Sequence, residues 1–233
     1  AEAESVIRVG FPVQSGLTMK DENGNYAGYT YDYLKEIGQY TGWTYEFVEP
    51  QGSMDEQLIQ MMDMLERGEL DLVGAMNNNK QTSSVFDFPS ENYGNAYSVI
   101  AVRDDDDRID EYNLSDFKGL RIALLKQADY HNEKFYQYAK LNGIQYEIVW
   151  CERDGEQEER VYSGKADALL SVDVSLSQGF RPVAKFSPTP FYFATTKGNT
   201  KIINELNRAI SYISENNPTL QMNLYNKYFS RSG

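Results

Sequence analysis

The sequence is poor in the residues on which many metal and catalytic sites depend. It has one cysteine, Cys151, and one histidine, His131, in 233 residues. No disulfide can form within the chain, and a zinc site or a histidine-based triad would need several carboxylates as substitutes. We expect His131 to be a surface residue of a helix and not a base. The composition therefore argues against a zinc site and a histidine-based triad, and it leaves the compartment open. We expect no metal, no cofactor and no catalytic residues.

Positive charge and long apolar runs are also scarce. The chain has 22 Lys and Arg against 35 Asp and Glu, so its formal net charge is −13. This charge disfavours nucleic acids and anionic membrane surfaces as partners, because both repel an acidic chain. No run approaches the ~18 apolar residues that a membrane-spanning helix needs. With 41% hydrophobic and 13% aromatic residues, the chain still has enough apolar surface to bury real cores.

One pattern occurs twice and suggests the organisation of the whole chain. In Leu65–Met76 the end of a helix is followed by Gly-x-x-Asp and an apolar strand, and Val161–Val172 repeats this order. Two copies suggest two similar α/β lobes, although a glycine between a helix and a strand is also common wherever a helix ends. Asp71 and Asp167, the aspartates of the two copies, stand at strand entrances, so we expect them to be structural.

Strands and helices alternate along most of the chain, which is typical of mostly parallel sheets with helices on their faces. We expect strands at Val6–Phe11, Trp43–Val48, Leu70–Ala75, Asn95–Arg103, Arg121–Leu125, Ile144–Trp150, Ala168–Val172, Val183–Phe186 and Phe191–Thr195. We expect helices that start near Thr30, Ser53, Asp129, Gln157, Thr200 and Pro218. The polar stretch Asn77–Ser84 lacks a period and is expected to be a loop at the carboxyl end of a strand.

Two extended runs, Asn95–Arg103 and Pro190–Thr196, are natural crossings between the lobes. Lobe 1 is then expected to comprise residues 1–101 and 193–233, and lobe 2 residues 102–192. Parallel sheets bind ligands at the carboxyl ends of their strands, so the expected site is there.

A series of short motifs resembles the family 3 extracellular solute-binding proteins. The motifs are Ile7-Arg8-Val9-Gly10, Asn23-Gly24, Gly28-Tyr29-Thr30-Tyr31-Asp32, Gly68-Glu69-Leu70-Asp71-Leu72-Val73, Phe86-Asp87-Phe88, Leu114 with Phe117-Lys118-Gly119, Gly164-Lys165-Ala166-Asp167-Ala168, and Tyr225 with Tyr228-Phe229. Each motif is weak alone, and their order and spacing cover nearly the whole chain.

The resemblance implies a type 2 periplasmic-binding fold, with two mostly parallel sheets flanked by helices and a two-strand hinge. Members of the family enclose a small ligand when the two lobes close. They serve ABC importers, mostly for polar amino acids, or form the outer sensor of membrane receptors. The partner would then be a membrane permease or a fused signalling protein. The location would be extracellular, cell-surface or periplasmic, with the full-length protein tethered to a membrane.

The resemblance also assigns ligand contacts by position. In amino-acid-binding members, an arginine after the third strand clamps the ligand carboxylate, because its planar fork suits two oxygens. Here Thr82 stands at that position, and Asp129 replaces the hydroxyl of a glycine-hydroxyl turn. The family aspartate that holds the ligand ammonium aligns with Asp173. The resemblance therefore implies an amino-acid-like ligand or a cationic amine without a free α-carboxylate.

The remaining contacts come from lobe 1. Ala75, Met76 and Asn77 align with its main-chain and side-chain contacts, and Phe11 and Tyr29 would supply apolar walls.

Several alternatives stay open. Asp129 and Asp173 would also serve as helix caps, or as cleft carboxylates of a dehydratase-like enzyme. A degenerate sensor or interaction domain that binds no ligand is a further alternative.

Overall fold

The chain forms two compact units, and the first of them is made of two separate stretches of the sequence. The structure is a computed structural model in which residues 5–110 and 113–230 are described. Unit 1 comprises the chain up to Asn95 together with Pro190–Ser230, and unit 2 comprises Ala96–Thr189. The two expected boundaries, after residues 101 and 192, lie six and three residues beyond the observed ones.

Unit 1 is built on a sheet whose first strands are parallel. Strand β1 (Val6–Gly10) pairs in parallel with β4 (Thr44–Val48), and Val9 bridges to Leu72 just before β5 (Val73–Met76). The C-terminal part of β11 (Phe180–Thr196) then runs antiparallel to β5 and to β6 (Phe86–Asp87). A small hairpin joins β2 (Met19–Lys20) to β3 (Tyr26–Ala27), as the Asn-Gly signal predicts.

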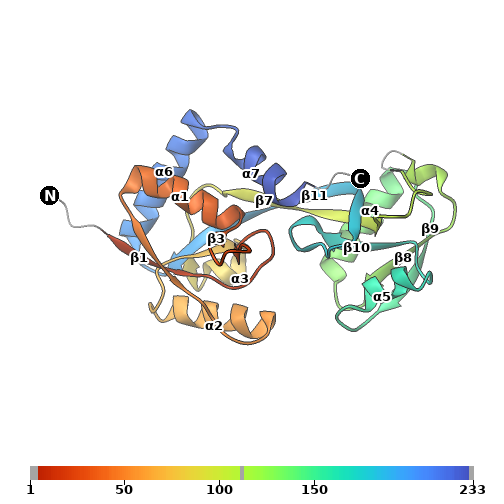
Figure 1. Ribbon diagram of the computed structural model, residues 1–233, viewed down its shortest axis with the longest axis horizontal. Helices are drawn as coiled ribbons and strands as arrows, with labels where there is room; N and C mark the ends of the chain where they lie inside the picture. Colours follow the sequence, from red (N-terminus) through yellow and green to blue (C-terminus); the bar gives the residue numbers. More distant parts are fainter. Residues whose placement is uncertain (1–4, 111–112, 231–233) are drawn as a thin grey trace. The chain divides into compact units, whose positions relative to one another are not determined.

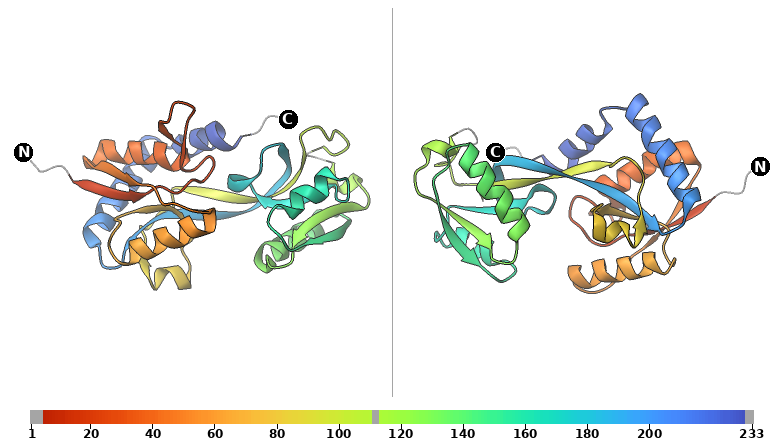
Figure 2. Two further views of the ribbon diagram at one scale, coloured as in Figure 1. Left: turned by 60° about the horizontal axis from the view of Figure 1, so that its bottom comes forward. Right: turned by 180° about the vertical axis from the view of Figure 1, so that it is seen from behind.

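Helices cover both faces of this sheet. Helices α1 (Tyr29–Thr41), α6 (Thr200–Asn216) and α7 (Leu220–Phe229) lie on one side, and α2 (Met54–Glu66) lies on the other (Figures 1 and 2). Met61 and Leu65 of α2 pack on Leu70 and Val73. On the opposite side, Tyr33 of α1 contacts the Tyr93 ring at 5.2 Å between centroids.

Unit 2 has the strand order β7-β10-β8-β9, with bounds Gly94–Arg103 for β7, Ala168–Val172 for β10, Leu120–Leu125 for β8 and Tyr146–Cys151 for β9. Strands β8, β9 and β10 are parallel, and β7 is antiparallel to β10. Helices α4 (Asp129–Leu141) and α5 (Glu156–Tyr162) cover opposite faces of this sheet. The short turns are η1 (Leu114–Asp116) and η2 (Asp173–Ser175).

The period of two along β8 explains these two layers. Ile122 and Leu124 belong to the cluster under α4 that contains Phe135, whereas Ala123 belongs to the cluster under α5 that contains Val161. Successive side chains of a strand point to opposite faces, so a strand that is apolar on both faces needs a helix on each. The predicted α/β class with mostly parallel sheets flanked by helices is confirmed.

Local details differ from the expectation where caps and short turns are involved. The N-cap of α1 is Gly28, and the hydroxyl of Thr30 instead lies 2.8 Å from the Tyr93 hydroxyl. The expected loop at 77–84 contains a four-residue helix, α3 (Lys80–Ser83). The two strands expected after Val183 are one continuous strand, β11, which passes from unit 2 into unit 1.

Candidate functional site

The two Gly-x-x-Asp copies form equivalent arginine–aspartate clasps. The Asp71 carboxylate accepts hydrogen bonds from the main-chain N–H of Arg8 at 2.8 Å, from its Nε at 3.0 Å and from its Nη2 at 3.0 Å. In unit 2 the carboxylate of Asp167 accepts the same three donors from Arg121, at 2.9, 3.2 and 2.9 Å. The expectation that both aspartates are structural is confirmed.

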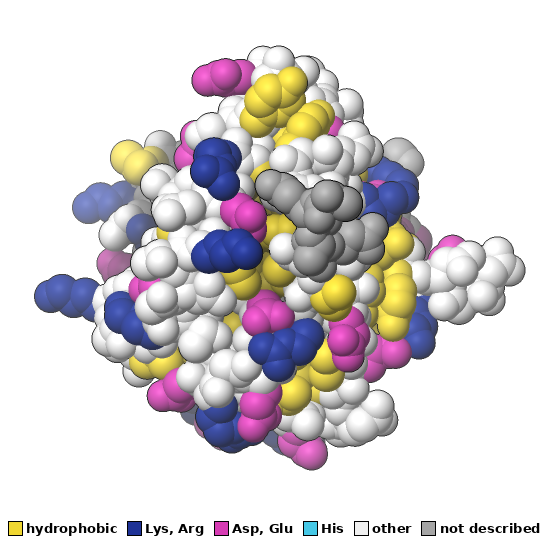
Figure 3. Space-filling model, turned by 90° about the vertical axis from the view of Figure 1, so that its left-hand side faces the viewer, with side chains coloured by type: hydrophobic (Ala, Val, Ile, Leu, Met, Phe, Trp, Pro, Cys, Tyr) yellow, Lys and Arg dark blue, Asp and Glu magenta, His cyan; other side chains and the backbone are white. Residues whose placement is uncertain are grey.

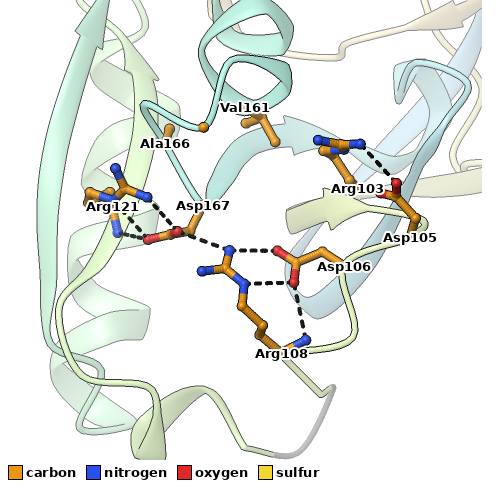
Figure 4. Close-up of a pocket in the computed structure, with 9 residues that line it drawn as sticks. Arg103, Asp105, Asp106, Arg108, Arg121, Val161, Ala166 and Asp167 are labelled. Carbon is orange, nitrogen blue, oxygen red and sulfur yellow. Dashed lines mark hydrogen bonds and ion pairs between the residues drawn. The ribbon is translucent and has the colours of Figure 1, made fainter.

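A second arginine strengthens the clasp of unit 2. Nη2 of Arg108 lies 3.1 Å from Asp167 and 2.8 Å from Asp106 (Figure 4). Burial alone raises the pKa of Asp167, but the hydrogen bonds from Arg121 and Arg108 outweigh it and lower this pKa. The pKa of Asp71 is also lowered, because the hydrogen bonds from Arg8 outweigh its burial.

These unit 2 charges line a pocket of about 370 Å³. Three arginines and three aspartates face it, so their formal charges cancel: Arg103, Arg108, Arg121, Asp105, Asp106 and Asp167. The clasp lies at the start of β8 and just before β10, which is the amino end of both strands. Parallel sheets bind ligands at the opposite end. We therefore interpret the ion pairs that line this pocket as structural, and we place the candidate ligand site at the carboxyl ends of the strands.

At the carboxyl end of β5, the side chain of Thr82 is committed to the local fold. Its hydroxyl donates to the main-chain oxygen of Asn77 at 2.7 Å and accepts from the N–H of Asn79 at 3.0 Å. The Asn79 side chain in turn accepts from the Thr82 N–H at 2.9 Å, which completes a capping box at the start of α3. The Asn-x-x-Thr spacing of this capping box is visible in the sequence, although the polar stretch around it predicts a loop.

The strand just before this turn has an unusual backbone. Ala75 has a φ of 54°, a left-handed value that non-glycine residues rarely adopt. Its N–H donates to the hydroxyl of the buried Tyr93 at 2.7 Å. Met76 is half-buried and Asn77 is exposed. Such local strain persists where the surroundings fix it, and it is frequent at functional sites.

The two expected apolar walls of unit 1 lie inside its core. Phe11 and Tyr29 are each 2% exposed. The ring of Phe11 packs against Tyr26 at 4.6 Å between centroids, and the hydroxyl of Tyr29 donates to the main-chain oxygen of Tyr93 at 2.6 Å. These positions favour a role in packing for both rings. A role as ligand walls stays a prediction.

In unit 2, Asp173 directly follows β10 and is 4% exposed. Its Oδ1 accepts from the N–H of Tyr97 on β7 at 2.9 Å. The ammonium of Lys185, on β11, lies 4.1 Å from the centroid of the Tyr97 ring. Burial lowers the pKa of Lys185, and the charge of Asp173 opposes that shift. Sequence reasoning missed this lysine, because Tyr97, which contacts both Asp173 and Lys185, lies on β7, far from both of them along the chain.

The start of α4 differs from the expected cap. Asp129 is the first residue of the helix and is exposed, whereas the N-cap position belongs to Ala128. The N-cap of η2 is likewise Val172, so neither Asp129 nor Asp173 is a capping residue. Asn132, which sequence reasoning missed, is 3% exposed and donates its Nδ2 to the main-chain oxygen of Leu125 at 2.8 Å.

The surface is not dominated by one sign of charge on every side. On the face drawn in Figure 3, basic and acidic side chains are interspersed, and hydrophobic side chains lie in small groups between them. Within residues 5–110 and 113–230, no helix is long and apolar enough to cross a membrane.

The comparison with protein families decides the identity of the fold. The profile of the bacterial extracellular solute-binding proteins, family 3, matches residues 7–231. The chain belongs to this family. The resemblance carried by the short motifs is thereby confirmed, and the family to which the chain belongs is one of extracellular proteins.

Solved structures agree on the fold. The second substrate-binding domain of GlnP from Lactococcus lactis, in its open conformation, has a TM-score of 0.75 at 17% identity, with 100% of this chain and 99% of that chain covered. The probable amino-acid ABC transporter extracellular-binding protein ytmK of Bacillus subtilis has a TM-score of 0.74 at 20% identity, with 97% and 98% covered. The two-lobed periplasmic-binding fold is confirmed.

A third solved structure is relevant to the question of catalysis. It is an ancestral amino acid-binding protein that is a precursor of cyclohexadienyl dehydratase, with a TM-score of 0.61 at 23% identity and 97% and 96% of the chains covered. At these identities the solved structures show the fold alone. The comparison with curated proteins gives no match.

Proposed function

We propose that this family 3 protein binds a small extracellular solute by closure of its two lobes and is not an enzyme. The solute is amino-acid-like or a cationic amine, and it lacks a free α-carboxylate. The observation that carries this proposal is the state of Thr82. Its hydroxyl is used within the turn at 77–82, where amino-acid-binding members are expected to hold an arginine. A carboxylate would therefore meet no guanidinium fork there.

The opposite charge is retained in unit 2. Asp173 is a buried carboxylate at the carboxyl end of β10, which is where parallel sheets bind ligands. A carboxylate in unit 2, together with a threonine at the position expected to hold the carboxylate-binding arginine, favours a ligand that brings a positive charge and no carboxylate. We propose that Asp173 holds the amine of the solute, and that Asp129 at the start of α4 adds negative potential.

The names of the structural neighbours support the broader part of the proposal. One is a substrate-binding domain and another belongs to an amino-acid ABC transporter. We propose that this chain delivers its solute either to an ABC permease or to a fused signalling receptor, on the outer side of a membrane. A domain that binds no ligand is the alternative, and the loss of the arginine position favours it.

A thermal-shift screen with a matched pair of variants tests the proposal. Putrescine, spermidine and agmatine would be compared with alanine, glutamine and arginine. A ligand at 100 times its dissociation constant stabilises the fold by about 2.7 kcal/mol, so we expect amines to raise the melting temperature of the wild type.

Thr82→Arg is expected to add a response to α-amino acids, because it restores a fork for the carboxylate. Thr82→Val is the control, since it removes the same capping hydroxyl without adding a cation. Tight calorimetric binding of ordinary α-amino acids by the wild type would contradict the proposed solute class. The absence of any response in the wild type would favour the non-binding alternative.

A further inference from the structure

A second, smaller pocket lies entirely within unit 2, at the carboxyl ends of β8 and β10. Its volume is about 160 Å³. Its walls include the end of β8, the first turns of α4, the start of α5 and the residues that precede Asp173. The polar residues that line it are His131, Asn132, Gln157, Ser171 and Ser175.

One polar atom beside this pocket is left without a partner. Oδ1 of Asn132 is buried and accepts no hydrogen bond within the described part of the chain. The amide cannot be turned over to solve this, because Nδ2 donates to the main-chain oxygen of Leu125 at 2.8 Å, and a turned amide would set two oxygens against each other. A buried acceptor without a donor is unfavourable, so an occupant that donates a hydrogen bond to Oδ1 would stabilise the fold.

The side-chain amide of Gln157 resembles that of Asn132, because its nitrogen is hydrogen-bonded and its oxygen is left as an acceptor. Nε2 of Gln157 donates to the main-chain oxygens of Ala123 at 2.8 Å and Leu170 at 3.0 Å. Both of its N–H groups are therefore used, and the atom that remains is its oxygen. Since Asn132 and Gln157 both fix their nitrogens on main-chain oxygens, the amides leave acceptors. The complementary group on an occupant is a hydrogen-bond donor.

The lining also indicates the charge of that group. None of the described residues that line the pocket is an aspartate, glutamate, lysine or arginine. His131 is an exposed residue of α4, and its partial burial lowers the pKa of its imidazole. A cation would enter this pocket without a counter-charge, which is unfavourable. The volume equals that of about five water molecules at ~30 Å³ each, which suits a hydroxyl or a primary amide on a short chain.

We infer that this pocket is a subsite for the neutral, donor-bearing end of the solute, a hydroxyl or a primary amide that donates to Asn132 Oδ1. The inference rests on the proposed function, because it takes the occupant to be part of the same solute. The pocket includes Ser171 and Val172, which directly precede Asp173. Oδ1 is itself almost fully covered, so a small side-chain shift accompanies its pairing.

Two probes of similar shape separate donor recognition from simple filling of the pocket. Acetamide donates two N–H groups, whereas acetone, in which a methyl group replaces the NH2, donates none. With ¹⁵N-labelled protein, we expect millimolar acetamide to shift the side-chain amide resonances of Asn132 and Gln157 saturably, and acetone to leave them unchanged. This experiment uses the wild-type chain and does not depend on a variant that folds.

The matched variants are Asn132→Leu and Asn142→Leu. Asn142 also donates its Nδ2 to a main-chain oxygen, that of Tyr138, at the far end of α4. We expect Asn132→Leu to weaken acetamide binding at least tenfold and Asn142→Leu to leave it unchanged. Equal resonance shifts with both probes would overturn the inference. It would also be overturned if the response to acetamide did not saturate and a crystal structure showed only an ordered water at Asn132 Oδ1. A failed amine screen together with a positive acetamide titration would instead overturn the amine assignment and leave the pocket standing.

Discussion

The two clasps predict that the same substitution has unequal effects on the two units. In Asp167→Asn, the amide loses the charge that binds Arg121 and Arg108 through four hydrogen bonds. The side chain of Asp167 is 4% exposed, whereas that of Asp71 is 18% exposed and has one arginine. Breaking a fully buried pair costs about 3–5 kcal/mol. Because the side chains of Arg108 and Arg121 are 54% and 39% exposed to water, we expect a smaller loss for Asp167→Asn, of about 2–3 kcal/mol.

For Asp71→Asn we expect about 1.5–2 kcal/mol, at the lower end of the range for hydrogen bonds to charged groups. In a chain of this size, 1 kcal/mol corresponds to about 2–4 °C in melting temperature, so Asp167→Asn is expected to lower it by about 4–12 °C. Differential scanning calorimetry measures both variants and shows whether one transition moves alone. A loss for Asp71→Asn that equals or exceeds that for Asp167→Asn would refute the reasoning.

The same clasp predicts a pH dependence. The pKa of Asp167 is lowered by folding, so its contribution is fully present above the unfolded pKa of about 3.9 and is lost as the pH falls through the lower folded value. The stability difference between the wild type and Asp167→Asn should therefore be constant from pH 7 to pH 5 and shrink below pH 4. Urea unfolding at each pH measures it, and a difference that persists unchanged well below pH 3 would contradict the assignment.

Two further substitutions test other features. Gly28→Ala should lower the free energy of unfolding by about 3 kcal/mol or more, because Gly28 has a φ of 117° and an added Cβ would collide with the carbonyl of Leu17. Gly24→Ala should lower it by only about 1 kcal/mol, because Gly24 has a φ of 78° and open space around it. Equal losses for the two variants in chemical unfolding would contradict this account. Lys185→Met should raise the affinity for putrescine about 3- to 10-fold in calorimetry. The reason is that the ammonium of Lys185 competes with the ammonium of putrescine for the negative charge of Asp173, an interaction of about 1 kcal/mol. An unchanged affinity would show that the charges of Lys185 and Asp173 are not coupled.

The order of helices and strands was predictable from the sequence, because it depends on patterns among residues that are close together along the chain. Apolar residues follow one another along β8, and each Gly-x-x-Asp copy marks the entrance of a strand. These patterns depend on neighbours a few residues away, so they indicate elements and their order correctly. The arginines of the clasps were not anticipated, because Arg8 and Asp71 are 63 residues apart in the sequence.

The candidate site was less predictable, since its details depend on contacts between distant segments. Tyr29 is buried where its ring packs against that of Tyr93 and its hydroxyl donates to the main-chain oxygen of Tyr93, 64 residues away. The unpaired oxygen of Asn132 arises from the way α4 meets the end of β8, and nothing in the residues around it marks it. By contrast, the role of Thr82 was within reach, because its cap partner Asn79 is only three residues away.

The division of the chain between the units sets an order for folding during synthesis. Unit 2 is contiguous in sequence, but unit 1 is complete only when Thr195 donates to the carbonyl of Asp71 at 2.6 Å and Thr196 to that of Leu65 at 2.7 Å. At 5–20 residues per second, the roughly 100 residues between the two parts of unit 1 take about 5–20 s to emerge from the ribosome. Until then, β5 has an unpaired edge. The unit whose first strand is made first is therefore the last to be completed, and the edge of β5 is exposed to mispairing during that time.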